Sequence, residues 1–142
     1  MPYKLTDVHT TADAGLEVLG ASPEELFADA AIGMTEIMVE LDGLTEKREV
    51  AFDLEGTTLD DLFFNWLSEV IFYKDAECLL LKRCELKILE EDEKFTLRAR
   101  IFGDEIDPER HTLKVDVKAV TYYRFGIKKE DDHWRGMVVF DL

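Results

Sequence analysis

The stretch TTLDDLFFNWLSEVIFYKD, residues 57–75, decides the fold because its apolar residues recur at helical spacing. Thr58 is the predicted N-cap of this helix, and Asp61 stands where a capping glutamate would stand. The apolar positions form one continuous stripe along the helix: Leu59, Leu62, Phe63, Trp66, Leu67, Val70 and Ile71. Such a stripe needs a flat apolar surface to cover it.

A second helix is predicted in ASPEELFADAAIGMTEIMVEL, residues 21–41. Ser22 is a suitable N-cap, Pro23 fits the first helical position, and Glu25 completes a capping box. Apolar residues follow at helical spacing, and Gly43 is expected to end the helix. This helix also has an apolar stripe that must be buried.

The remaining sequence has the period-two alternation of strands, which supplies the surface that the helices need. Apolar and polar side chains alternate in residues 48–56, 94–102 and 112–120. Residues 79–95 indicate a strand that enters a hairpin near Asp92. The nearly continuous apolar run 135–142 indicates a central strand. Residues 15–20 and 122–129 are predicted as further strands. This order predicts an α+β fold with a mixed, largely antiparallel sheet and two helices packed on one face.

Size and composition indicate one globular domain over residues 1–142. The sequence is 46% hydrophobic and 35% charged, and it contains no apolar run of the roughly 20 residues that cross a bilayer. Because residues 1–7 contain no apolar signal region, we expect a cytoplasmic protein. Cys78 and Cys84 do not form a C-x-x-C motif, so we expect both to be structural.

The formal net charge of −15 bears on the choice of partner. Nucleic-acid affinity comes largely from Lys and Arg side chains that release phosphate counterions, and this chain has no basic arm. Tight direct binding to RNA or DNA is therefore not expected. An acidic surface suits a basic protein partner or bound cations, and it also suits simple solubility.

Sequence motifs for nucleophilic hydrolysis, phosphate loops, dinucleotide binding and zinc proteases are absent. The residues with the most unusual context are acids at predicted strand ends, Asp13 and Asp141, the latter followed by Leu142 with its α-carboxylate. A hard cation such as Ca²⁺ or Mg²⁺ would relieve the repulsion between such oxygen donors. Sequence spacing does not show that Asp13 and Asp141 meet. For Asp104, Glu105 and Asp107, and for the three histidines, solvated loop or turn positions are the simpler interpretation.

Lys118 has two interpretations. Strand alternation within residues 112–120 places its side chain on the polar face with Lys114 and Asp116, where a solvated lysine is ordinary. A functional role for the lysine is the alternative.

The chain resembles the archease family over nearly its whole length. The resemblance rests on TTADAGLEV, SPEELFADAAIGM, LDDLFFNWLSEVIF, VKAVTYYRFGI and MVVFDL, which occur in the family's order. It implies an α+β fold and a non-enzymatic protein that activates the GTP-dependent tRNA-splicing RNA ligase, promoting its guanylylation and multiple turnover. It also implies a divalent-cation site, seen as calcium, formed by Asp13, Asp141 and Leu142, and a functional role for Lys118. Mg²⁺ or Mn²⁺ are the alternative ions.

Two family histidines are replaced here, by Thr10 and by Tyr123, while His9 stands one position before the first. These replacements leave the acidic ligands in place but put any histidine role in doubt. Two other functions remain open from the sequence: a metal-dependent phosphoester hydrolase, and a chaperone-like interaction module with a structural ion.

Overall fold

The computed structural model describes residues 3–6 and 13–142. In chain order its elements are β1 (Tyr3–Thr6), β2 (Asp13–Gly20), α1 (Pro23–Met38), the 3₁₀ turn η1 (Leu41–Gly43), β3 (Arg48–Gly56), α2 (Leu59–Glu77), β4 (Leu79–Glu91), β5 (Lys94–Glu105), β6 (Ala119–Glu130) and β7 (His133–Asp141). From β2 onward this order is the one predicted from the sequence, except that a single strand, β6, replaces the two predicted over residues 112–120 and 122–129. The short β1 was not predicted.

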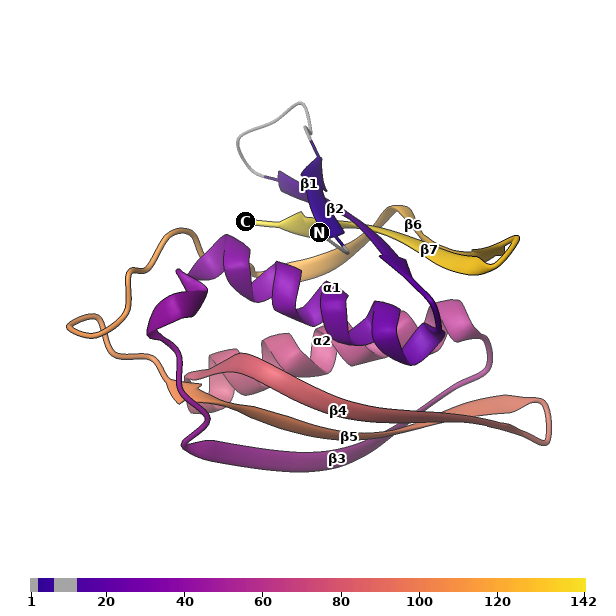
Figure 1. Cartoon of the computed structure of the whole chain (residues 1–142), viewed down its shortest axis with the longest axis horizontal. Coiled ribbons are helices and arrows are strands. Elements are labelled where there is room, and N and C mark those ends of the chain that lie inside the picture. The colour runs from indigo at the N-terminus through magenta and orange to yellow at the C-terminus, as the bar shows by residue number, and fades with distance from the viewer. Residues whose placement is uncertain (1–2, 7–12) are drawn as a thin grey trace.

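The strands form two antiparallel sheets with both helices between them (Figure 1). The four-stranded sheet has the order β1-β2-β7-β6, and the three-stranded sheet has the order β3-β5-β4. Both helices contact both sheets, so each sheet has the two helices on one of its faces. The predicted α+β class and the antiparallel pairing are confirmed. The division into two sheets was not predicted, because alternation shows which residues face a core but not which neighbour a strand pairs with.

The predicted starts of both helices are confirmed by their caps. The Ser22 hydroxyl accepts a hydrogen bond from the Glu25 N–H at 3.2 Å, and Thr58 accepts one from the Asp61 N–H at 3.0 Å. Helix α1 ends at Met38 and not at Gly43. The chain leaves the helix there because Val39 is extended and forms an antiparallel bridge with Leu113.

Helix α2 ends at Glu77, and its C-cap residue Cys78 adopts a left-handed conformation with φ of 56°. Its N–H donates to the Tyr73 carbonyl, as in a helix C-cap. Cys78 is exposed, whereas Cys84 is half-buried in β4, where burial raises the pKa of its thiol to about 12. In the described residues neither helix combines the length and apolarity needed to cross a membrane.

The core fills the space between the two sheets around the helices. Trp66 of α2 is fully buried, and its indole N–H donates to the Phe27 carbonyl of α1 at 2.8 Å. The rings of Phe27 and Phe63 lie 4.9 Å apart and join the helices further. The apolar stripe predicted for residues 57–75 is therefore the centre of the molecule, because it contacts α1 and both sheets.

The predicted strand over residues 112–120 is wrong for most of its length. Residues 114–118 have no regular structure, and β6 begins only at Ala119. Leu113 and Val115 are exposed, although alternation predicted that they face the core. The segment instead bonds to the end of α1, where the Lys114 N–H donates to the Met38 carbonyl at 2.8 Å.

Candidate metal site

Asp13 and Asp141 lie directly opposite each other on neighbouring strands. Asp13 is the first residue of β2 and Asp141 the last of β7, and the two are register partners in this antiparallel pair. Directly opposed residues of such a pair project to the same face, with Cβ atoms about 4.5–5.5 Å apart. The fold thus brings together two carboxylate residues that are remote in the sequence.

The two acids are on the outer face of the four-stranded sheet, away from the helices. The next pair in the ladder is Ala14 with Phe140, and Phe140 is fully buried, so this pair faces the core. Alternation then turns Asp13 and Asp141 outward, and Asp141 is exposed. Ala119 of β6 is the partner of Asp141 on its other side, which completes a row across three strands. The end of β7 lies beside β2 in Figure 1.

Leu142 follows β7 directly, and its side chain packs against the core. An apolar side chain offers a cation no ligand. Any contribution of Leu142 to a cation site must therefore come from its main-chain oxygen.

Lys118 is exposed and lies next to the acidic pair. Its N–H donates to the Asp141 carbonyl at 2.8 Å, and it directly precedes Ala119. Sequence alternation placed Lys118 within a strand, but the structure places it in the irregular segment one residue before β6. Its main chain is therefore fixed beside the end of β7.

Lys74 of α2 positions this segment, and the sequence analysis did not identify it. Its side chain is only 6% exposed, and its ammonium donates to the Val117 carbonyl at 2.8 Å and to Asp116 at 2.6 Å. It also pairs with Asp75 at 2.5 Å. Burial acts to lower the pKa of Lys74, but the hydrogen bonds to Asp116 and Asp75 outweigh it and raise that pKa.

The signal for Lys74 was present in the sequence. Position 74 falls three and four residues after Ile71 and Val70, so a lysine stands on the apolar stripe of α2. A charged residue in such a place must find partners.

The two carboxylates are the type of ligand that a hard divalent cation prefers, but two side chains are fewer ligands than such a cation needs. Carboxylate oxygens are the ligands that Ca²⁺ and Mg²⁺ prefer, and like charges directly opposite each other on a sheet repel. Within the described residues there is no group of three or more His, Cys, Asp or Glu side chains that could hold a metal ion. Further donors would have to be main-chain oxygens or water.

The other acids and histidines singled out in the sequence divide into three cases. His9 and Thr10 lie outside the described residues. His133 is half-buried and lies near Glu130 and Asp132. The interpretation as solvated residues is wrong for both Asp104 and His111, because they are 2% and 4% exposed and pair with each other at 3.2 Å.

Strand β6 contains a long irregular bulge next to the candidate site. Thr121 pairs with Val139 and Gly126 with Met137, so the four residues 122–125 stand opposite Val138 alone. Tyr122 and Tyr123 project outward and are 78% and 58% exposed. Bulges often re-aim side chains beside functional sites. Tyr123, which replaces a family histidine, therefore points to solvent.

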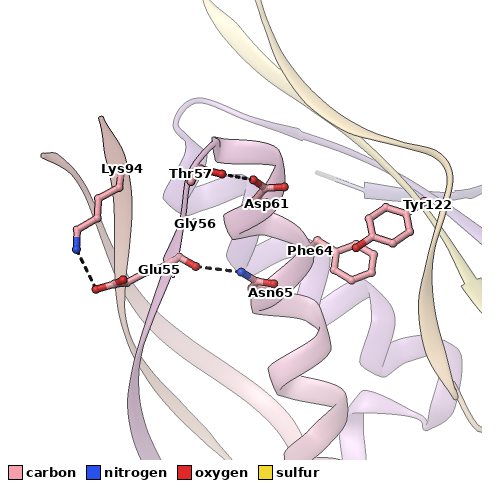
Figure 2. Close-up of a pocket in the computed structure, with 8 residues that line it drawn as sticks. All are labelled: Glu55, Gly56, Thr57, Asp61, Phe64, Asn65, Lys94 and Tyr122. Carbon is pink, nitrogen blue, oxygen red and sulfur yellow. Dashed lines mark hydrogen bonds and ion pairs between the residues drawn. The ribbon is translucent and has the colours of Figure 1, made fainter. Parts of the chain in front are cut away.

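A separate hollow of about 390 Å³ lies between α2 and the neighbouring strands (Figure 2). Its polar groups largely bind one another: Lys94 pairs with Glu55 at 3.2 Å, and Thr57 donates to Asp61 at 2.6 Å. Tyr122 closes one side by stacking on Phe64, with ring centroids 4.2 Å apart. These pairings hold the walls of the hollow together, and the sequence analysis singled out none of the residues that line it for a function.

Comparison with known proteins gives a consistent result. The model of one protein family, the archease protein family, matches residues 3–142. A protein of Methanopyrus kandleri named "Protein archease" is 33% identical over 142 residues, which is 100% of both chains. The solution structure of Methanobacterium thermoautotrophicum protein 1598 superposes with a TM-score of 0.87 at 33% identity and covers 99% of each chain. A Thermotoga maritima crystal structure described as "an archease, possible chaperone" has a TM-score of 0.62 at 21% identity, covers 96% of each chain, and supports the fold alone.

Proposed function

This chain belongs to the archease family, and we propose that it acts as a protein cofactor that activates the GTP-dependent tRNA-splicing RNA ligase. In this role it promotes guanylylation of the ligase and multiple turnover, without catalysing a reaction itself, in the cytoplasm. The observation that supports the proposal most directly is the register pairing of Asp13 with Asp141. Two acids that the family resemblance assigns to one site are neighbours in the fold.

The proposed site consists of the two carboxylates of Asp13 and Asp141 and the main-chain oxygen of Leu142. A divalent cation held there, calcium first and magnesium or manganese as alternatives, would supply positive charge that offsets the repulsion between Asp13 and Asp141. The β2–β7 ladder fixes the spacing of the two acids, and Lys74 holds the segment that carries Lys118.

Lys118 is the residue proposed to reach toward the ligase. The residue is exposed and its main chain bonds to Asp141, and a lysine ammonium suits a phosphate of a nucleotide bound to the partner. The net charge of −15 agrees with action through the enzyme, because an acidic surface repels the RNA backbone.

The test is single-turnover guanylylation of the ligase with the wild-type protein and with Asp13→Asn or Asp141→Asn. Asparagine keeps the size of the side chain and removes its charge, so we expect both variants to lose most of the stimulation. The matched control is Asp132→Asn, because the Asp132 side chain is 97% exposed in the turn between β6 and β7. Equal stimulation by all four proteins would rule out the acidic pair as the functional site.

Two other functions are distinguished by their own measurements. A phosphoester hydrolase would turn over phosphoesters with Mg²⁺ or Mn²⁺ and lose this activity in Asp13→Asn. A chaperone-like module, the role named for the T. maritima protein, would suppress aggregation of unrelated proteins to the same degree in the wild type and in both acid variants.

A further inference from the structure

A second surface lies at the opposite end of the β2–β7 ladder from the acidic pair. Trp134 is the partner of Gly20 there, seven residues before Asp141 on β7. At roughly 3.3 Å per residue this separates the two places by about 23 Å. Trp134 lines a pocket of about 410 Å³ that lies between the two sheets, beside the first residues of both helices. The pocket is therefore distinct from the candidate metal site.

The floor of the pocket is apolar and combines residues from both sheets. Ile88 and Phe95 come from the three-stranded sheet, whereas Ile127 and Trp134 come from the four-stranded sheet. All four side chains are half-buried and pack against the edge of the core. They present a concave apolar surface of the kind that accepts a large side chain.

The rim of the pocket is acidic. Its charged lining residues are Glu24, Asp60 and Glu90, and no lysine or arginine is among the lining residues. Glu90 begins the run Glu90–Glu93, which contains four acids at the tip of the β4–β5 hairpin. Lys87, Lys128 and Arg135 each adjoin a lining residue in the chain, and Lys129 is the register partner of Trp134, but none of these bases lines the pocket. The pocket therefore favours a cationic partner over an anionic one.

Two of the rim acids also fix the walls. The Asp60 carboxylate accepts a hydrogen bond from the Ile127 N–H of β6 at 2.9 Å, and Glu24 accepts one from the Ile88 N–H of β4 at 3.4 Å. Strands β4 and β6 are edge strands of their sheets, so these bonds occupy amides to which an added strand would pair. Since a carboxylate has several acceptor positions, each acid can still receive a lysine or arginine.

From these observations we propose that the pocket binds a segment of another protein in which a large apolar side chain is flanked by lysine or arginine. The apolar side chain enters between Ile88 and Ile127, and the flanking cations pair with the acidic rim. Recognition comes mainly from side chains, because the amides of Ile88 and Ile127, at the pocket itself, are already bonded to the rim acids. A second copy of this chain is a poor occupant, since two chains of net charge −15 repel. The acids of the rim also repel the phosphates of a nucleic acid.

Trp134 provides a direct measurement. The other tryptophan, Trp66, is fully buried and hydrogen-bonded, so a fluorescence change on titration reports on Trp134. The probe is a blocked peptide of sequence Lys-Lys-Leu-Phe-Lys-Lys. The comparison peptides replace the two central residues by serine or the four lysines by glutamate. We expect saturable binding of the first peptide only, and added salt should weaken this binding. The fluorescence change should be absent in Trp134→Phe.

Matched variants on one strand locate the binding. Ile88→Lys places a cation on the floor of the pocket, whereas Leu89→Lys places it one residue along, on the opposite face of β4, where Leu89 is already 39% exposed. We expect Ile88→Lys to weaken peptide binding at least about tenfold and Leu89→Lys to leave it nearly unchanged. Glu90→Lys, at an exposed position, tests the rim without disturbing the core.

The proposal is overturned if the basic apolar peptide gives no saturable signal. It is also overturned if the serine peptide binds equally well, because that result shows attraction to an acidic surface without a pocket. Equal binding by Ile88→Lys and Leu89→Lys, both shown to be folded by circular dichroism, would place the peptide elsewhere. None of these outcomes depends on the proposed activation of the ligase.

Discussion

Asp104 is a single buried carboxylate that ties three segments of the chain together. It accepts hydrogen bonds from the Thr45 N–H at 3.3 Å, from the Arg110 guanidinium at 3.2 Å and from His111 at 3.2 Å. The Nδ1 atom of His111 accepts from the Asp107 N–H, so the proton that faces Asp104 is on Nε2. These contacts connect the turn after α1, the end of β5 and the loop that leads to Lys118.

Removing the negative charge of Asp104 should lower the free energy of unfolding by an amount that depends on pH. Burial acts to raise the pKa of Asp104, but the hydrogen bonds from Arg110, Thr45 and His111 outweigh it and hold that pKa well below its usual value. A carboxyl group with a lowered pKa contributes stability above its unfolded pKa of about 3.9, and this contribution is lost as the pH falls toward the folded value. We expect Asp104→Asn to lose about 1–3 kcal/mol at pH 7.

The measurement is urea unfolding of the wild type and Asp104→Asn at pH 7 and pH 3. The difference between the two proteins should be largest at pH 7 and smaller at pH 3. Asp132→Asn is the control, since its side chain is 97% exposed. A difference that stays constant between the two pH values would show that the charge of Asp104 does not stabilise the fold.

At the scale of elements, the helices were predictable because their determinants are local. The caps at Ser22 and Thr58 and the apolar stripe of residues 57–75 depend on residues within a few positions of each other. The end of α1 was predicted five residues late because Val39 pairs with Leu113, a contact that no local pattern records. The prediction of a strand over residues 114–118 failed for the same reason. Their polar alternation is real, but Lys114 bonds to α1 and Val117 to α2, and only Lys118 bonds to a strand.

Helix α2 should support the segment before β6 through Lys74. In Lys74→Met the buried stem is retained but the Val117 carbonyl loses its donor, so we expect a loss of about 1–3 kcal/mol in the free energy of unfolding. If this segment positions Lys118, stimulation of ligase guanylylation should also fall. Thermal unfolding and the guanylylation assay measure the two effects separately.

Lys94→Met is the matched control for that change. Lys94 is also a lysine paired with an acid, but its side chain is 46% exposed, and exposed pairs contribute little. We expect its stability to remain within about 0.5 kcal/mol of the wild type. A Lys74→Met protein as stable and as active as Lys94→Met would remove Lys74 from the positioning role.

At the scale of the whole molecule, the sequence indicated which residues are buried but not the arrangement of two sheets around a helical centre. Each sheet is antiparallel and connects strands that are distant in the chain, such as β2 with β7. The meeting of Asp13 and Asp141 is a property of this topology, so spacing alone did not reveal it, and only the family resemblance named the pair. The pocket between the sheets was also hidden, since its lining comes from both helices and four strands.

The net charge of −15 gives a prediction for the folded molecule as a whole. Self-repulsion destabilises a compact state, and raising NaCl from 50 to 500 mM shortens the screening length from about 14 Å to about 4 Å. We therefore expect the melting temperature to rise by a few degrees with NaCl. A bound cation would add a separate effect, because any ligand that binds only the folded state stabilises it by mass action.

Calorimetry at matched ionic strength separates the two effects. Screening depends on ionic strength alone, so NaCl and CaCl₂ solutions of equal ionic strength should act equally on a protein without a specific site. We expect CaCl₂ to raise the melting temperature of the wild type further than NaCl does, and we expect this excess to disappear in Asp13→Asn and to persist in Asp132→Asn. Because Asp13 and Asp141 are opposed in one ladder, Asp141→Asn should behave as Asp13→Asn does. An identical response of the wild type to the two salts would mean that the opposed carboxylates hold no calcium, and the stabilisation would then be a property of the overall charge.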